Sequence, residues 1–331
     1  MLVAGLVRVG ACRVRVGAGT ILVPDFQGLA MSAPTVDKLR ALSGGFDPRN
    51  GAMVHRGLDL SNPTETTLEE IEAFKGHYAA QFGSALEGLD WWFDKNTEIL
   101  KRYRLYCSLT LRVEPAVTGG GTLGFYALNG YERGVKYVIQ SFQQDGISKA
   151  QMMEIVGLAF VHAGPRGMQC IARALDGWEF IESPNPPARF PAGWAPDIEA
   201  FRSGLDFSTP ELLAGEFEKI QAWYQDLIGE VPGHVMFLGK HRPYLLKTHR
   251  ARMENMLYHL PKQMWPSYML YYHVMTRCRE GIRENILLGK AWGVSKSDTL
   301  DVIGNALVYG QMEAATMVED VAGDIFDGWS E

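Results

Sequence analysis

The chain has 331 residues, of which 47% are hydrophobic and 21% charged, an ordinary balance for a globular protein large enough for more than one domain. Its formal net charge of -6 argues against nucleic-acid binding, which normally needs a basic patch. No stretch approaches the roughly 18–20 apolar residues of a membrane helix, so we expect no membrane partner. The 4 cysteines stand far apart without a CxxC pair, which predicts a reducing, cytoplasmic compartment.

Residues 1–30 lack the pattern of a targeting segment. Three arginines, Arg8, Arg13 and Arg15, interrupt the apolar residues, whereas a secretory signal needs an unbroken apolar run after its basic residues. The segment also contains no serine, which a transit peptide would normally supply. We predict that residues 1–30 are a disordered arm or a non-native extension, and that the natural start is Met31.

Most of the remaining chain has helical patterns. A capping box at Thr66–Glu70 opens an amphipathic stretch that runs to Phe82. Five prolines in fourteen residues exclude a helix from Ser183 to Pro196, and helical signals resume at Ser208, where a cap precedes proline. Strand-like alternation is rare, so the sequence predicts an all-α protein. The other expected helices cover residues 94–109, 123–145, 149–175 and 268–288.

The two halves of the chain resemble each other. Gly-Ile-Ser-Lys at 146–149 matches Gly-Val-Ser-Lys at 293–296, an offset of 147 residues, and Gly134 matches Gly281 at the same offset. A repeat of this period indicates a duplicated domain rather than a solenoid. The expected layout is a first helical repeat at 31–182, a proline-rich linker at 183–208 and a second helical repeat at 209–331.

The second repeat contains further motifs: Arg-Pro-Tyr-Leu-Leu-Lys at 242–247, Leu-Pro-Lys at 260–262, and a long helical stretch through His273 and Cys278 to the Gly293 turn. This pattern resembles the alkylhydroperoxidase D / carboxymuconolactone decarboxylase superfamily over roughly residues 85–175 and 225–325. The resemblance implies two tandem AhpD-like helical domains that associate into a homo-oligomer, a trimer or dimer. It also implies a small-molecule substrate and no metal or organic cofactor.

Most redox residues of that family are missing here. The family's helix carries Cys-x-x-Cys-x-x-x-His, a pattern that brings two thiols and an imidazole onto one face. The corresponding positions are Cys278, Gly281 and Asn285 in the second repeat, and Tyr131, Gly134 and Val138 in the first. Pro266 stands where the family has an acidic residue. A dithiol peroxidase is therefore disfavoured, because only one of six positions is kept.

Three functions stay open. The first is a carboxymuconolactone decarboxylase-like lyase acting on a small, carboxylate-bearing ring or lactone acid. In it His273 would move protons, Arg277 would hold the carboxylate, and Tyr272 or His162 would donate a proton. The second is a peroxiredoxin-like thiol peroxidase that uses Cys278 and an external thiol. The third is a catalytically degenerate protein for ligand binding or assembly.

Several candidates also have a structural interpretation. Cys278 could be a small apolar residue in the core, as most free cysteines are. Glu280 and Glu284 continue the spacing of His273 and Arg277 along the expected 268–288 helix, and for these two glutamates we favour a solvated face with Arg–Glu pairs. His162 and its counterpart in the second repeat, Tyr309, could face each other across a pseudo-twofold axis or merely cap a core.

Overall fold

The computed structural model describes the backbone of residues 11–16 and 19–24, and residues 54–55, 57–60, 62, 65–82, 91–92, 95–108 and 115–330. The chain divides into two compact units, Met1–Gly45 and Phe46–Glu331. In the first unit, strands β1 (Ala11–Val16) and β2 (Gly19–Pro24) pair antiparallel, with Val14 opposite Ile21. The segment predicted to be a disordered arm therefore contains a hairpin, which its β-branched residues favour. The rest of that segment and the proposed start at Met31 lie outside the described residues.

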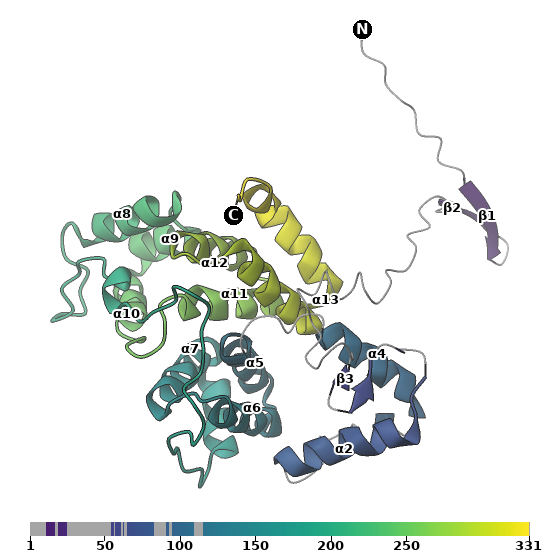
Figure 1. The fold of residues 1–331 in the computed structure, drawn as a ribbon. Coiled ribbons are helices and arrows are strands. Elements are labelled where there is room, and N and C mark those ends of the chain that lie inside the picture. Colours follow the sequence, from purple (N-terminus) through teal and green to yellow (C-terminus); the bar gives the residue numbers. More distant parts are fainter. Residues whose placement is uncertain are drawn as a thin grey trace. The chain divides into compact units, whose positions relative to one another are not determined.

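The second unit is almost entirely helical, as the sequence predicts (Figure 1). A short hairpin, β3 (Val54–His55) with β4 (Leu58–Asp59), precedes the helices. The helices of the first half are α2 (Leu68–Phe82), α4 (Thr97–Ser108), α5 (Pro115–Asn129), α6 (Glu132–Gln144) and α7 (Lys149–Ala174). After the 3-10 turn η1 (Ile198–Phe201) come α8 (Glu216–Ile228), α9 (Gly233–His241), α10 (Pro243–Glu254), α11 (Met264–Thr276), α12 (Arg279–Ala291) and α13 (Lys296–Asp327).

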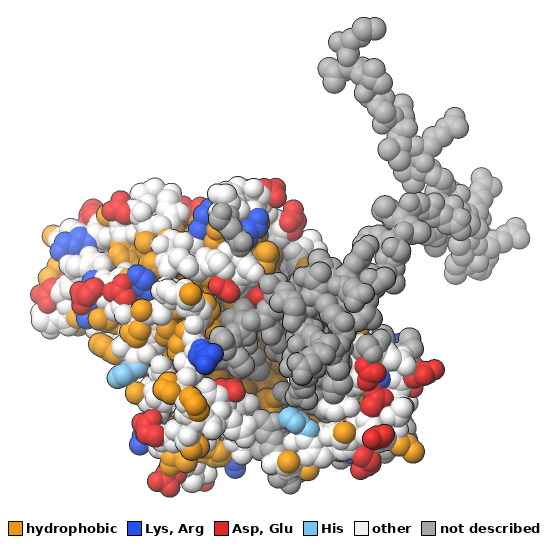
Figure 2. Space-filling view, viewed as in Figure 1, with side chains coloured by type: hydrophobic (Ala, Val, Ile, Leu, Met, Phe, Trp, Pro, Cys, Tyr) orange, Lys and Arg blue, Asp and Glu red, His pale blue; other side chains and the backbone are white. Residues whose placement is uncertain are grey.

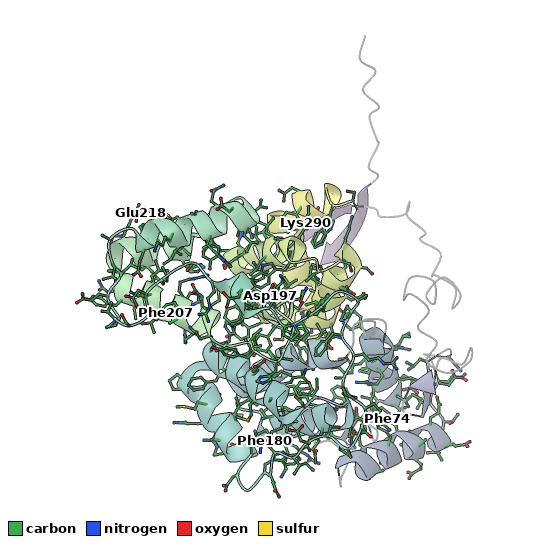
Figure 3. The ribbon with its side chains drawn as sticks, turned by 60° about the vertical axis from the view of Figure 1, so that its left-hand side comes forward. Phe74, Phe180, Asp197, Phe207, Glu218 and Lys290 are labelled. Carbon is green, nitrogen blue, oxygen red and sulfur yellow. The ribbon has the colours of Figure 1, made fainter. Side chains whose placement is uncertain are left out.

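The proline-rich segment between the halves is extended and packs against them. Trp194 is buried, and the amide of Ala188 donates to the carbonyl of Gly146 at 2.9 Å. Asp197, labelled in Figure 3, forms an ion pair with Lys262 at 2.8 Å. Helix α8 begins at Glu216 rather than at the predicted cap near Ser208, since residues 207–211 form turns instead.

Two helices expected to be continuous are each broken in two. The expected 123–145 helix ends at Gly130, with φ 73°, and the expected 268–288 helix ends at Arg277, with φ 57°. Both residues adopt the left-handed conformation that terminates a helix. Gly130 suits it, whereas Arg277 is a non-glycine residue in the same role. His273 and Cys278 consequently belong to different helices.

The centre of the second unit is a close crossing of α5 and α11 (Figure 1). Gly121 lies directly under the ring of Tyr271, and Gly124 under the hydroxyl of Tyr268, so a Cβ atom at either glycine would overlap the ring above it. Both tyrosines are completely buried. The glycines cost helix propensity, but they let the two backbones approach closely enough to bury these rings.

A buried lysine–glutamate ion pair occurs in each half. Lys247 lies 2.8 Å from Glu216 and also donates to the carbonyl of Glu211. Lys101 lies 2.6 Å from Glu70 and donates to a backbone carbonyl in the same way. Burial opposes ionisation of Glu216, but hydrogen bonds from Lys247 and two backbone amides outweigh it and lower the pKa of this carboxyl. The Lys247–Glu216 pair links α10 to α8, and the Lys101–Glu70 pair links α4 to α2. In both pairs each buried charge has an opposite charge and further hydrogen bonds.

We predict that Glu216→Gln destabilises the protein by about 3–5 kcal/mol, because it leaves the buried ammonium of Lys247 without its counter-charge. Urea unfolding followed by circular dichroism measures this change. Replacing both partners, as in Glu216→Leu with Lys247→Met, should restore most of the loss. Glu199→Gln removes the exposed partner of Arg202 and should leave the free energy of unfolding unchanged. Equal effects of Glu216→Gln and Glu199→Gln would contradict the prediction.

Candidate functional site

Three of the residues singled out in the sequence meet where α7 packs on α11. The ring of His162 lies 4.6 Å from that of Tyr272 and 5.9 Å from that of His273, between centroids. The Tyr272 hydroxyl donates to the backbone carbonyl of His162 at 3.1 Å. The imidazole Nε2 of His162 faces the sulfur of Met269. These contacts hold the rings against one another.

Burial keeps both histidines neutral. It lowers the pKa of His162 to about 3, with a smaller contribution from the nearby His273. It lowers the pKa of His273 to about 4, with a smaller contribution from His234. A general base for neutral pH needs a pKa near 7, so neither imidazole is tuned for that role.

Arg277 and Cys278 lie at the junction of α11 and α12, where the amide of Cys278 donates to the carbonyl of His273 at 2.9 Å. Arg277 donates to the carbonyl of Gly310 at 3.2 Å and lies 3.6 Å from Glu313. Cys278 is exposed at the N-terminal end of α12, so it is not a core residue. Because α11 ends at Arg277, the expected placement of His273 and Arg277 on one helix face does not occur. The catalytic roles that the sequence suggests for His273, Arg277 and Cys278 stay predictions.

The cavity of the second half lies on α12. It has a volume of about 460 Å³, within the range of small-molecule sites. Helix α12 supplies four of the lining residues, the loop between α8 and α9 supplies three, and α13 supplies two. The lining residues are Glu230, Val231, Pro232, Arg279, Glu280, Arg283, Glu284, Asp320 and Val321.

Glu284 is the titratable group of this cavity with the most altered acidity. Burial, followed by the neighbouring charge of Glu280, raises the pKa of its carboxyl to about 7. Its Oε2 lies 3.7 Å from Nδ1 of His234. Burial lowers the pKa of His234, so at neutral pH the pair is not a fixed ion pair. Glu284 can therefore exist in both protonation states near pH 7.

Behind Glu284 lies a buried polar layer. The hydroxyl of Tyr224 is completely buried and has no hydrogen bond of normal geometry, although Glu284 and Arg250 are close enough to interact with it. Arg250 is itself buried, bonded to Glu254 at 2.9 Å and stacked 4.2 Å from the ring centre of Trp223. This layer holds α8, α10 and α12 together and offers Glu284 a donor when it ionises.

The sequence predicts a solvated face for Glu284, from its spacing to His273, Arg277 and Glu280, and that interpretation is wrong for this residue. Helix α12 packs on α8, and the side chain of Glu284 is only 15% exposed. Glu280 does remain exposed, as expected. No sequence motif indicates that Tyr224 and His234 lie near Glu284.

Comparisons with known proteins add no relative. No family model matches the chain, and neither a curated protein nor a solved structure is similar to it. Within the described residues, no helix is long and apolar enough to cross a membrane, and no group of three or more His, Cys, Asp or Glu residues could hold a metal ion. Figure 2 shows acidic and basic side chains interspersed over the face that it presents.

The two buried histidines should make stability depend on pH. Unfolding exposes them to water, where their pKa returns to about 6.5. Above about pH 7 both states are neutral and nothing changes. As the pH falls below about 6.5, these histidines become protonated in the unfolded chain but stay neutral in the folded chain. The free energy of unfolding therefore decreases.

We predict that His273→Gln reduces this loss between pH 7 and pH 5 by about 1–2 kcal/mol. Urea titrations at the two pH values give the measurement. His241→Gln, which changes an exposed imidazole, serves as the control and should lose stability like the wild type. If His273→Gln and the wild type lose the same amount, His273 is not kept neutral in the folded protein.

Proposed function

We propose that this chain is a cofactor-independent enzyme that moves a proton on a small molecule, with Glu284 as the acid–base group. One observation carries the proposal: a partly buried carboxyl, 15% exposed, with a pKa of about 7 on the wall of an open cavity of about 460 Å³. Strongly shifted carboxyls in clefts are typical of catalytic sites. The ionised form takes a proton from the substrate, and the acid form returns one to another atom.

The surrounding residues suit a group that alternates between two states. Tyr224 and Arg250 favour the ionised carboxylate, whereas burial and Glu280 favour the neutral acid. These opposing influences keep the two forms close in free energy at neutral pH. His234 lies near enough to exchange a proton with Glu284 after a small movement. Proton abstraction beside a carbonyl, followed by reprotonation, fits this arrangement.

We also propose that the two halves arose by duplication of an AhpD-like unit, as the sequence resemblance implies. Local structures recur at the expected offsets. Gly146 and Gly293 share a φ of 79°. The kinks inside α7 and α13 fall at Gly164 and Gln311, which are also 147 residues apart. The recurring Lys–Glu pairs support the same interpretation. Membership of the superfamily and a decarboxylase-like reaction rest on the resemblance alone.

The proposed site occurs once per chain. At an offset of 147 residues, the position of Glu284 corresponds to Tyr137 and that of Asn285 to Val138. Tyr224 has a counterpart in Tyr78 at an offset of 146 residues. The first half therefore keeps the scaffold but has no carboxyl at the reactive position. This asymmetry is the pattern expected when one copy retains chemistry and the other supports the fold.

A thiol peroxidase remains the second candidate because Cys278 is exposed at the start of α12. Its reaction would still need an external resolving thiol, since the position three residues later is Gly281. A degenerate binding protein is the third candidate. The mutations below separate all three.

We predict that Glu284→Gln lowers turnover at least ~100-fold, the low end of what an acid–base group contributes. The assay follows deuterium uptake from heavy water by NMR, in a panel of cyclic ketones and lactones with acidic, neutral or amine substituents. The wild-type rate should rise with pH through about 7, because the base must be ionised. Cys278→Ser should retain most of the rate. Reduction of a peroxide by an added thiol that Cys278→Ser abolishes, with equal exchange rates in Glu284→Gln and the wild type, would favour the thiol peroxidase.

We predict that the chain forms a homo-oligomer, a trimer or dimer. Exposed apolar side chains recur at matching positions of the two halves, at offsets of 146 or 147 residues: Trp91 with Phe237, Ile99 with Leu245, and Met153 with Leu300. Paired exposed positions of this kind are typical of association surfaces. Light scattering at micromolar concentration should give a multiple of 36.8 kDa. A monomer that persists at this concentration would contradict the prediction.

A further inference from the structure

The charges that line the α12 cavity are unbalanced. Four lining residues are acids and two are arginines. Arg279 lies 3.1 Å from Asp320. Arg283 lies 3.1 Å from both carboxylate oxygens of Glu230 and donates to the carbonyl of Val321 at 2.8 Å. Both arginines thus have partners within the protein, Arg283 through two guanidinium nitrogens and the exposed Arg279 through one.

The two remaining acids have no cationic partner among the described residues of the lining. Glu280 accepts a hydrogen bond from the amide of Gly233, at the start of α9. Among the lining residues, no cation pairs with Glu284; His234 lies 3.7 Å away, and burial lowers the pKa of that imidazole. Arg250 acts on Glu284 from behind the cavity, but its guanidinium is bonded to Glu254 at 2.9 Å. Four residues separate Glu280 from Glu284, so their side chains are neighbours on one face of α12.

We infer that the cavity binds its small-molecule substrate through a cationic group, a protonated amine or an amidinium, held between Glu280 and Glu284. This inference rests on the proposed function and deepens it by naming the substrate class. It replaces the carboxylate-bearing substrate that the sequence resemblance implied. A cation supplies the missing counter-charge, whereas a carboxylate would face two acids with no free arginine in the lining.

The buried layer behind Glu284 supports the same conclusion. The unpartnered hydroxyl of Tyr224 can donate to the ionised carboxylate but gains little from the neutral acid. A cation in the cavity favours ionisation, and ionisation gives this hydroxyl an acceptor. Binding and proton release by Glu284 are therefore coupled.

Because binding is coupled to ionisation of Glu284, the affinity for a cationic ligand should increase with pH. The charged or titratable groups that face Glu284 are Glu280, Glu230, Arg250, Tyr224 and His234. Their balance leaves the carboxyl with a pKa of about 7. Below that pH the group is mostly protonated and cannot pair with a cation. A permanently charged ligand should therefore bind more weakly by up to about tenfold at pH 6 than at pH 8.

The test uses four aromatic probes of similar size in isothermal titration calorimetry: benzamidine, benzylamine, benzyl alcohol and benzoate. We expect benzamidine and benzylamine to bind one site per chain at pH 8, at least about tenfold more tightly than benzyl alcohol. Benzoate should bind more weakly than the alcohol. Equal affinities of benzamidine and benzyl alcohol, or tighter binding of benzoate, would overturn the inference.

Variants locate the binding site. Glu280→Gln changes an exposed residue and should fold normally, so its expected loss of about tenfold in benzamidine affinity is a clean measurement. Glu284→Gln should also remove the pH dependence of binding. The matched control is Glu218→Gln, an exposed glutamate on the outer side of α8 that Figure 3 labels, and it should bind like the wild type. Wild-type affinity in Glu280→Gln would exclude this cavity as the cation site.

These measurements are independent of turnover. If Glu284→Gln loses deuterium exchange while the probes show no preference for cations, the proposed function stands and the inference on substrate class fails. If cations bind selectively but Glu284→Gln keeps full exchange activity, the cavity is a cation-binding site and the proposed catalytic role fails.

Discussion

The close crossing of α5 and α11 is the constraint on which the other features depend. Gly121 and Gly124 let the α5 backbone lie under the rings of Tyr268 and Tyr271, and a side chain at either position would force the helices apart. This approach sets α7 against α11, so that His162 contacts His273. Helix α11 also fixes the start of α12, and thereby the direction in which Glu284 points. A glycine pair in one half thus helps to position the helix that carries Glu284 in the other half.

Buried charge is handled in two different ways in this fold. Lys247 and Glu216 are fully paired, and their ionised states are stabilised by additional hydrogen bonds. Glu284 lacks such a partner, so it stays close to neutral and costs stability whenever it ionises. The glutamate of α8 is thus held in its ionised form, whereas the pKa of the glutamate of α12 is raised. Functional sites are the usual location of that difference.

The sequence predicted the helical class and most helix positions, because these follow from capping residues and apolar periodicity. It missed the breaks near residues 130 and 277. Gly130 is a recognisable helix terminator, but Arg277 adopts the same left-handed conformation without any sequence signal. It also missed the site. The pKa of Glu284 depends on its burial, which raises it, and on groups distant in the sequence, such as Tyr224 sixty positions earlier, which lowers it. No local spacing encodes these contacts.

His273 and Glu284 illustrate why residue type alone misplaces a catalytic group. Histidine is the usual choice for proton transfer because its ordinary pKa lies near neutrality. Burial moves it away from that value, since the charged form of an imidazole is the one that loses hydration. The same burial raises the pKa of a carboxyl toward neutral pH, because its deprotonated form is the charged one and loses hydration. Burial therefore makes the histidines less suitable for proton transfer at neutral pH and the glutamate more suitable. His162 of α7 and His273 of α11 stay neutral at pH 7, whereas Glu284, which the sequence places on a surface, titrates near pH 7.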